Sequence, residues 1–136
     1  MKPATRKLLQ AALDARRKAY APYSNFLVGC AVIADSGRIY TGANVENASY
    51  GLTICAERSA LFQMVAAGDL RFRTLLVTAD TEHPVRPCGA CLQVMVEFAL
   101  PKSRVIMAGK GDVVEEKPLA ELIPLAFSSP REGGGT

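Results

Sequence analysis

Two cysteines separated by two residues are the first candidates for chemistry in this chain. Cys88 and Cys91 lie in the stretch "RPCGACLQV", directly after Pro87. A pair at this spacing can close a disulfide, carry redox chemistry or hold a metal ion. The pair alone leaves these three interpretations open.

A second stretch, "TICAERSAL", favours metal binding. It carries a third cysteine, Cys55, and Glu57 follows two residues later. Each cysteine segment follows a loop and begins an expected helix. Two helix N-termini can therefore point at one spot, where their partial positive charge favours thiolates. Three thiolates on two converging helices suit Zn²⁺, which is four-coordinate and accepts soft sulfur ligands.

The fourth zinc ligand decides whether such a site is structural or catalytic, because a catalytic zinc keeps one position for water. Cys30, within "VGCAVIA", and His83, the only histidine, are the candidates for a fourth protein ligand. A free cysteine inside a strand is usually a small core residue. We expect an open position, because Glu57 beside a zinc-bound water can take its proton. By itself, Glu57 would be an ordinary first-turn glutamate favoured by the helix dipole.

The elements that must position these residues follow from apolar periodicity and from breaker residues. Their expected order, α-β-β-α-β-α-β-β, predicts a single-domain, three-layer α/β/α fold with a five-stranded mixed sheet. Residues 1–127 should form this domain, and residues 128–136 a mobile tail. The expected helices cover residues 4–20, 55–67 and 88–100, with a short helical turn in "PLAELIPLAF"; the expected strands cover residues 27–34, 38–45, 74–79, 104–107 and 113–115.

Composition narrows the class of protein. The 136 residues are 49% hydrophobic and 21% charged, which is apolar for this size and suggests that some surface is buried against other subunits. The net charge is +3, without a basic stripe interleaved with aromatic residues, so no nucleic-acid partner is expected. Neither a membrane span of roughly 18 apolar residues nor a signal-peptide core is evident. These features predict a cytoplasmic protein, in which structural disulfides are rare.

Five stretches carry a resemblance to the small zinc-dependent cytidine deaminases. They are "YAPYSNFLVG", "GANVENASYG", "TICAERSAL", "PCGACLQV" and "LIPLAF", in the order and spacing of that family. Cys-Ala-Glu followed by Pro-Cys-Gly-Ala-Cys is the zinc-deaminase signature, with cysteine in place of the first histidine. The resemblance covers roughly residues 17–127. It implies a homotetramer with shared active sites and one Zn²⁺ per subunit, held by Cys55, Cys88 and Cys91.

The resemblance also implies the reaction. Cytidine and deoxycytidine would be hydrolysed to uridine and deoxyuridine with release of ammonia, as in pyrimidine salvage. A zinc-bound hydroxide would attack the carbon that bears the amino group, with Glu57 as proton shuttle. Arg58 would donate hydrogen bonds to the thiolates and offset their charge. The family usually has an arginine after the last zinc cysteine, where this chain has Leu92.

Substrate contacts are implied in the same way. Asn44 and Glu46 match a ribose-binding pair, although their spacing alone would equally suit a polar strand end. Phe26 and Phe127 would otherwise be core residues. The alternatives to a nucleoside deaminase are a zinc deaminase acting on another small aminated base or nucleoside analogue, and a structural-zinc or redox module. The implied contacts are Phe26, Asn44, Glu46, the backbone N–H of Ala56 and, from neighbouring subunits, Tyr50 and Phe127.

Overall fold

A mixed five-stranded sheet forms the centre of the computed structural model, which describes residues 1–129. The strand order is β2-β1-β3-β4-β5, in which only β3 and β4 are parallel neighbours. The parallel pair is joined through a helix, as parallel strands require. The strands are β1 (Val28–Ala34), β2 (Ile39–Ala43), β3 (Phe72–Ala79), β4 (Ala99–Ala108) and β5 (Val114–Pro118).

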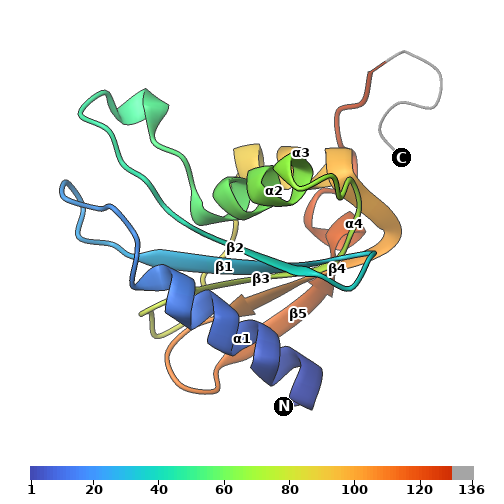
Figure 1. Cartoon of the computed structure of the whole chain (residues 1–136), viewed down its shortest axis with the longest axis horizontal. Helices are drawn as coiled ribbons and strands as arrows, with labels where there is room; N and C mark the ends of the chain where they lie inside the picture. Colours follow the sequence, from blue (N-terminus) through green and yellow to red (C-terminus); the bar gives the residue numbers. More distant parts are fainter. Residues whose placement is uncertain (130–136) are drawn as a thin grey trace.

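Helices cover both faces of this sheet (Figure 1). The helix α1 (Pro3–Arg16) lies on one face, and α2 (Ala56–Ala66) and α3 (Gly89–Phe98) lie on the other. A short helix, α4 (Leu119–Leu122), follows β5, and a 3-10 turn, η1 (Tyr50–Leu52), precedes α2. The predicted three-layer α/β/α fold is confirmed.

The sheet separates two apolar clusters because successive strand residues point to opposite faces. Leu76 and Ile106 pack with α1 on one side. Leu75, Val77 and Met107 pack with α2 and α3 on the other, in the larger cluster. The cysteine-bearing helices therefore rest on the larger core.

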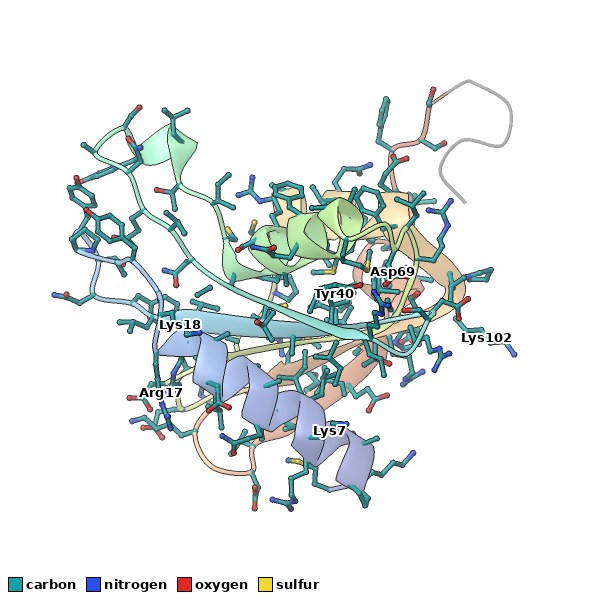
Figure 2. The ribbon with its side chains drawn as sticks, in the orientation of Figure 1. Lys7, Arg17, Lys18, Tyr40, Asp69 and Lys102 are labelled. Carbon is teal, nitrogen blue, oxygen red and sulfur yellow. The ribbon has the colours of Figure 1, made fainter. Side chains whose placement is uncertain are left out.

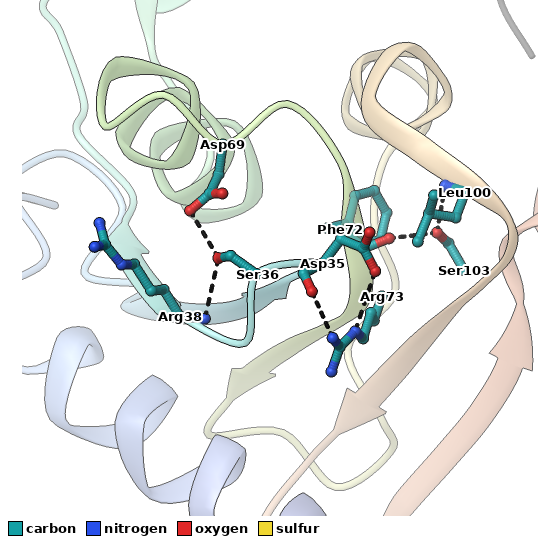
Figure 3. A network of polar contacts seen from close by, with 8 residues as sticks. All are labelled: Asp35, Ser36, Arg38, Asp69, Phe72, Arg73, Leu100 and Ser103. Atoms are coloured by element: carbon teal, nitrogen blue, oxygen red, sulfur yellow. Dashed lines mark hydrogen bonds and ion pairs between the residues drawn. The ribbon is translucent and has the colours of Figure 1, made fainter.

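The predicted element boundaries differ most from the structure at the end of α1 and at the start of β4. The helix α1 ends at Arg16, because the chain turns to let Tyr20 pair with Val45 as an isolated bridge. The strand β4 begins directly after α3, so Pro101 lies inside a strand. Proline is tolerated there because the pairing of β3 with β4 shifts register at this point. Ser103 closes the irregularity by accepting from the Leu100 N–H and donating to the carbonyl oxygen of Phe72 (Figure 3).

Gly42 allows α2 to lie directly against β2. A Cβ atom at this position would lie 2.4 Å from the backbone nitrogen of Ala60 and 2.8 Å from the carbonyl oxygen of Ala56. Any larger residue would therefore push the first turns of α2 away from the sheet. Those turns carry Cys55 and Glu57, so Gly42 helps to set their position.

The C-terminal end of α2 is tied to the β1–β2 hairpin. Ser36 Oγ donates a hydrogen bond to Asp69 at 3.0 Å and accepts one from the backbone N–H of Arg38 at 3.3 Å (Figure 3). The Tyr40 hydroxyl donates to the same carboxylate at 2.5 Å (Figure 2). This bond lowers the pKa of Asp69 below its ordinary value. Both ends of α2 are thus anchored to the first two strands.

The remaining fold predictions concern membranes and the C-terminal tail. Within residues 1–129, each helix is too short or too polar to cross a membrane. The predicted mobile tail begins at Ser128, and its residues 130–136 lie outside the described part of the chain.

Candidate active site

Three cysteines meet where α2 and α3 begin. Cys55 and Cys88 are the N-cap residues of the two helices, and Cys91 lies in the first turn of α3. Their Sγ atoms all lie within 4.8 Å of one another, and those of Cys88 and Cys91 are 3.5 Å apart. The convergence of two helix N-termini is as the sequence predicted, and all three thiols are free.

The two candidates for a fourth protein ligand lie elsewhere. Cys30 is fully buried in the middle of β1, and His83 is exposed in the loop after β3. Among residues 1–129, the cluster of side chains that could hold a metal contains only the three cysteines. This arrangement agrees with a site that keeps an open position.

The thiols of Cys55 and Cys91 differ in their tendency to ionise. Hydrogen bonding to Cys91, and then to Arg58, lowers the pKa of Cys55 to about 5. The same bond to Cys55, together with burial, raises the pKa of Cys91. A thiolate at Cys55 thus disfavours a second thiolate at Cys91, and a bound cation would favour the ionised form of both.

Arg58 lies beside this cluster. Its guanidinium donates to Cys55 Sγ at 3.4 Å, and within the described residues its buried Nε has no hydrogen-bond partner. A cation that donates to thiolates reduces their negative charge and so strengthens a metal held by them as a Lewis acid. Leu92, in the position of the family's usual arginine, packs against the larger apolar cluster and supplies no charge. Arg58 is therefore positioned to offset thiolate charge without an arginine at position 92.

Glu57 is placed by the first turn of α2. The residue is only 5% exposed, and burial, reinforced by the negative charge on Cys55, raises the pKa of its carboxyl to about 7. A carboxyl group that titrates near neutrality can both accept and release a proton. Glu57 lies two residues after Cys55 and therefore next to the three-cysteine cluster.

Zinc fits this group of residues. Three sulfur ligands from two helices, an adjacent arginine and a buried carboxyl match the donor set of a catalytic zinc with cysteine ligands. When bound, Zn²⁺ supplies Lewis acidity and lowers the pKa of a water molecule to near 7.

Asn44 holds the loop between α1 and β1. It lies just after β2 and is 7% exposed. Its Nδ2 donates to the carbonyl oxygen of Phe26 at 2.8 Å, and its Oδ1 accepts from the N–H of Val28 at 2.9 Å. The sequence suited Asn44 either to sugar binding or to a polar strand end, and it did not reveal these two contacts.

Glu46 holds the same loop at an earlier point. Its Oε1 accepts from the N–H groups of Tyr23 at 2.9 Å and Ser24 at 3.1 Å, and its Oε2 accepts from the Ser24 hydroxyl. These bonds lower the pKa of Glu46 below its ordinary value. Glu46 also lines a cavity of about 270 Å³, together with Tyr23, Ser24, Asn47, Tyr50 and Thr53.

Four of these cavity residues, Tyr23, Ser24, Asn47 and Thr53, were missed by sequence reasoning. The ring centroids of Tyr23 and Tyr50 are 6.0 Å apart in an edge-to-face arrangement. Their segments lie side by side beyond the end of the sheet in Figure 1. Tyr23 belongs to "YAPYSNFLVG" and Asn47 to "GANVENASYG", so those two stretches were the available signal.

The aromatic candidates are exposed. Phe26 is 42%, Tyr50 76% and Phe127 74% accessible, so neither phenylalanine is a buried core residue of the single chain. Phe127 accepts a hydrogen bond at its carbonyl oxygen from Gln93 of α3 at 3.0 Å. Its ring lines a different cavity, of about 330 Å³, formed with residues of α3, β4 and α4.

Three thiols at two helix N-termini and a buried carboxyl next to them suit metal-dependent hydrolysis. Residues 3–108 match the family model described as "Cytidine and deoxycytidylate deaminase zinc-binding region". The chain therefore belongs to the zinc-dependent cytidine deaminase family.

Individual relatives agree with this membership. A protein of Sporosarcina psychrophila named "Cytidine deaminase" is 50% identical over 90% of each chain. One of Halalkalibacterium halodurans with the same name is 45% identical over 90% of this chain and 92% of its own. The crystal structure of the cytidine deaminase from Burkholderia pseudomallei shares 46% identity and a TM-score of 0.86, covering 93% of this chain and all of its own.

Proposed function

We propose that this protein deaminates cytidine and deoxycytidine hydrolytically, giving uridine or deoxyuridine and ammonia. The observation that carries the proposal is the buried Glu57 beside the three-cysteine cluster. The chain is also 50% identical to a relative named for this reaction. Such an activity serves pyrimidine salvage.

We assign the zinc ligands to Cys55, Cys88 and Cys91, and the proton transfers to Glu57. The Glu57 carboxylate takes a proton from the attacking water and delivers protons to the ring nitrogen and then to the amino group. The carbon–nitrogen bond breaks once the amine is protonated, so one water is consumed and one ammonia leaves. Arg58 limits the negative charge of the thiolates throughout.

Recognition of the base is assigned to Ala56 and Phe26. Ala56 is the first residue of α2, and the first N–H groups of a helix have no acceptor within it. That N–H is next to Cys55 and is suited to hydrogen-bond the pyrimidine carbonyl. The half-exposed ring of Phe26 offers an apolar face for the base.

Recognition of the ribose is assigned to Asn44, Glu46 and Tyr50. Glu46 and Tyr50 line the same cavity of about 270 Å³. The two polar side chains retain hydrogen-bonding capacity, since an amide has two N–H donors and a carboxylate has about four acceptor sites. Sugar hydroxyls can use what remains after the loop contacts.

The assembly we propose is a homotetramer with shared sites, in which residues 1–127 form the catalytic domain of each subunit. Tyr50, Leu125 and Phe127 are 76%, 96% and 74% exposed and offer apolar surface to a neighbouring subunit. Burial against neighbouring subunits would account for this exposure. The free thiols support a reducing compartment, and we propose the cytoplasm.

Ultraviolet absorbance tests the proposed reaction. Purified protein with known zinc content is incubated with cytidine, deoxycytidine, cytosine and CMP, and ammonia is measured in parallel. We expect turnover of both nucleosides and little or none of the free base or the nucleotide. If only a different aminated base is turned over, that base and not cytidine is the substrate. Zinc binding without any deamination would favour a structural-zinc module.

A further inference from the structure

We propose that Ser24 is a positioning residue for nucleoside binding, whose hydroxyl couples the Glu46 carboxylate to the backbone of Phe26. This inference rests on the proposed function, since it takes Glu46 and Phe26 as substrate contacts.

The Ser24 hydroxyl makes two hydrogen bonds in opposite senses. It donates to Glu46 Oε2 and accepts from the backbone N–H of Phe26 at 3.0 Å. The Ser24 backbone N–H donates to the other Glu46 oxygen at 3.1 Å. One serine therefore joins the carboxylate assigned to ribose and the amide of the residue assigned to the base.

The backbone of Phe26 is fixed on both sides. Its N–H donates to Ser24 Oγ at 3.0 Å, and its carbonyl oxygen accepts from Asn44 Nδ2 at 2.8 Å. The Phe26 ring remains 42% exposed and does not anchor itself in the core. Hydrogen bonds from Ser24 and Asn44 thus hold the peptide groups on either side of the residue.

The residue between Ser24 and Phe26 is held in a rare backbone conformation. Asn25 has φ of 58°, the only non-glycine residue within residues 1–129 with a positive φ. Such a conformation persists when the surrounding contacts determine it. The Asn25 N–H donates to the carbonyl oxygen of Ala21 at 2.9 Å, and the flanking bond between Ser24 and Phe26 adds a second contact, so the geometry of this turn depends in part on Ser24.

The residues assigned to the sugar and to the base are therefore both held by the Ser24 hydroxyl. If the Ser24 hydroxyl is removed, Glu46 loses one donor and the Phe26 N–H loses its acceptor. The carboxylate and the ring would then be less well fixed before the nucleoside binds. Ordering them during binding weakens affinity but leaves Glu57 and the metal ligands in place.

Ser36 provides a matched control. Its hydroxyl also donates to a carboxylate, that of Asp69, and accepts from the N–H two residues later, that of Arg38 (Figure 3). Asp69 lies beyond the C-terminal end of α2, whereas Cys55 caps its N-terminus. The 11 residues of α2 separate the two ends by about 16 Å. Replacing Ser36 by alanine therefore removes the same two kinds of hydrogen bond at a place far from the site.

The experiment compares Ser24→Ala, Ser24→Thr and Ser36→Ala in the zinc-loaded full chain. We expect Ser24→Ala to raise KM for cytidine by about fivefold to thirtyfold with kcat changed less than about twofold, as lost binding without lost chemistry requires. The dissociation constant of uridine, measured by calorimetry, should rise by the same factor. Ser24→Thr keeps the hydroxyl and should restore most of the affinity. Ser36→Ala should lower the melting temperature to a similar extent as Ser24→Ala without changing KM.

Three results would overturn the inference: a native KM in Ser24→Ala, an equal rise of KM in Ser36→Ala, or no rescue by threonine. Glu46→Ala separates this failure from that of the proposed function. If Glu46→Ala weakens the binding of cytidine and Ser24→Ala does not, the proposed function stands and the inference about Ser24 fails. If the native protein neither deaminates cytidine nor binds uridine, both fail.

Discussion

Glu57 and Arg58 are adjacent in the sequence but serve different tasks because a helix turns about 100° between successive residues. Glu57 is buried, while Arg58 reaches back to Cys55 Sγ. Burial matters for Glu57 because it keeps the carboxyl poised near neutrality, and contact matters for Arg58 because it offsets thiolate charge. These different environments make their substitutions separable by experiment.

Glu57→Gln should keep the fold and the zinc but lose the proton shuttle. Positioned proton transfer is worth about 100- to 10,000-fold per step, so kcat should fall by at least this factor. Steady-state kinetics and elemental analysis of the same preparation measure the two properties together. Near-native turnover in this variant would remove Glu57 from the proposed role.

Zinc content should depend on three cysteines and not on the other two candidates. Cys91→Ala should lose most of the metal, since one of three thiolate ligands is removed. His83→Ala and Cys30→Ala should keep about one zinc per chain, because His83 is exposed in a loop and Cys30 is buried within β1, both outside the metal cluster. Loss of zinc in either of these two variants would contradict the open-site arrangement.

At the scale of elements, the site depends on how closely α2 and α3 approach the sheet. Each helix contributes its N-terminus, so a shift of either helix moves a ligand relative to the others. The position of the N-terminal turns of α2, which lie next to Cys55, is set by Gly42.

Gly42→Ala should disturb this placement. The added methyl group would meet the α2 backbone at 2.4 Å, and overpacking of this kind costs about 1–3 kcal/mol of unfolding free energy. We expect a lower melting temperature and weaker zinc binding, measured by thermal unfolding and by competition with a chelator. The control is Gly51→Ala, because a Cβ atom there has nothing within 4 Å. Equal stability of the two variants would show that α2 does not need this close approach.

At the scale of the whole molecule, the single chain leaves its proposed pocket open. Phe127 is 74% exposed and lines a cavity other than the one lined by Tyr50. An aromatic ring on the second face of the base must then come from another subunit in the assembly we propose. This arrangement predicts complementation between inactive variants.

Glu57→Gln and Phe127→Ala subunits should regain activity when mixed. Some sites of a mixed tetramer would receive native Glu57 from one chain and native Phe127 from another. Alone, Phe127→Ala should raise KM by about fivefold, since ring stacking is worth about 1 kcal/mol, with zinc content intact. Activity is assayed after dissociation and reassembly, with light scattering to determine the subunit number. A fully active monomer, or no gain on mixing, would contradict shared sites but not the deaminase assignment.

Phe127 also defines the limit of the proposed catalytic domain. Truncation after Phe127 should keep activity, whereas truncation after Ala126 should resemble Phe127→Ala. Both truncated chains are compared with the full chain in KM for cytidine and in zinc content. Complete loss of activity in the chain that ends at Phe127 would place a required residue within 128–136.

The sequence by itself determined the chemistry and the layers of this protein. Three cysteines and a glutamate at fixed spacings, at the starts of two helices, are local features, and local features can be interpreted without knowing distant contacts. The apolar periodicity likewise predicted the order of strands and helices along the chain. Its largest boundary errors, at the end of α1 and the start of β4, lie where a bridge and a register shift take over from local preference.

Only the tertiary structure decided what Asn44, Glu46 and Ser24 contact. Their hydrogen bonds join residues from 2 to 23 positions apart, and no local pattern indicates which backbone groups a folded loop leaves for them. The tertiary structure also showed that Phe26 and Phe127 are exposed, because exposure depends on what the other elements cover and not on residue type. Spacing selects which residues can react, whereas packing fixes which groups remain free to bind.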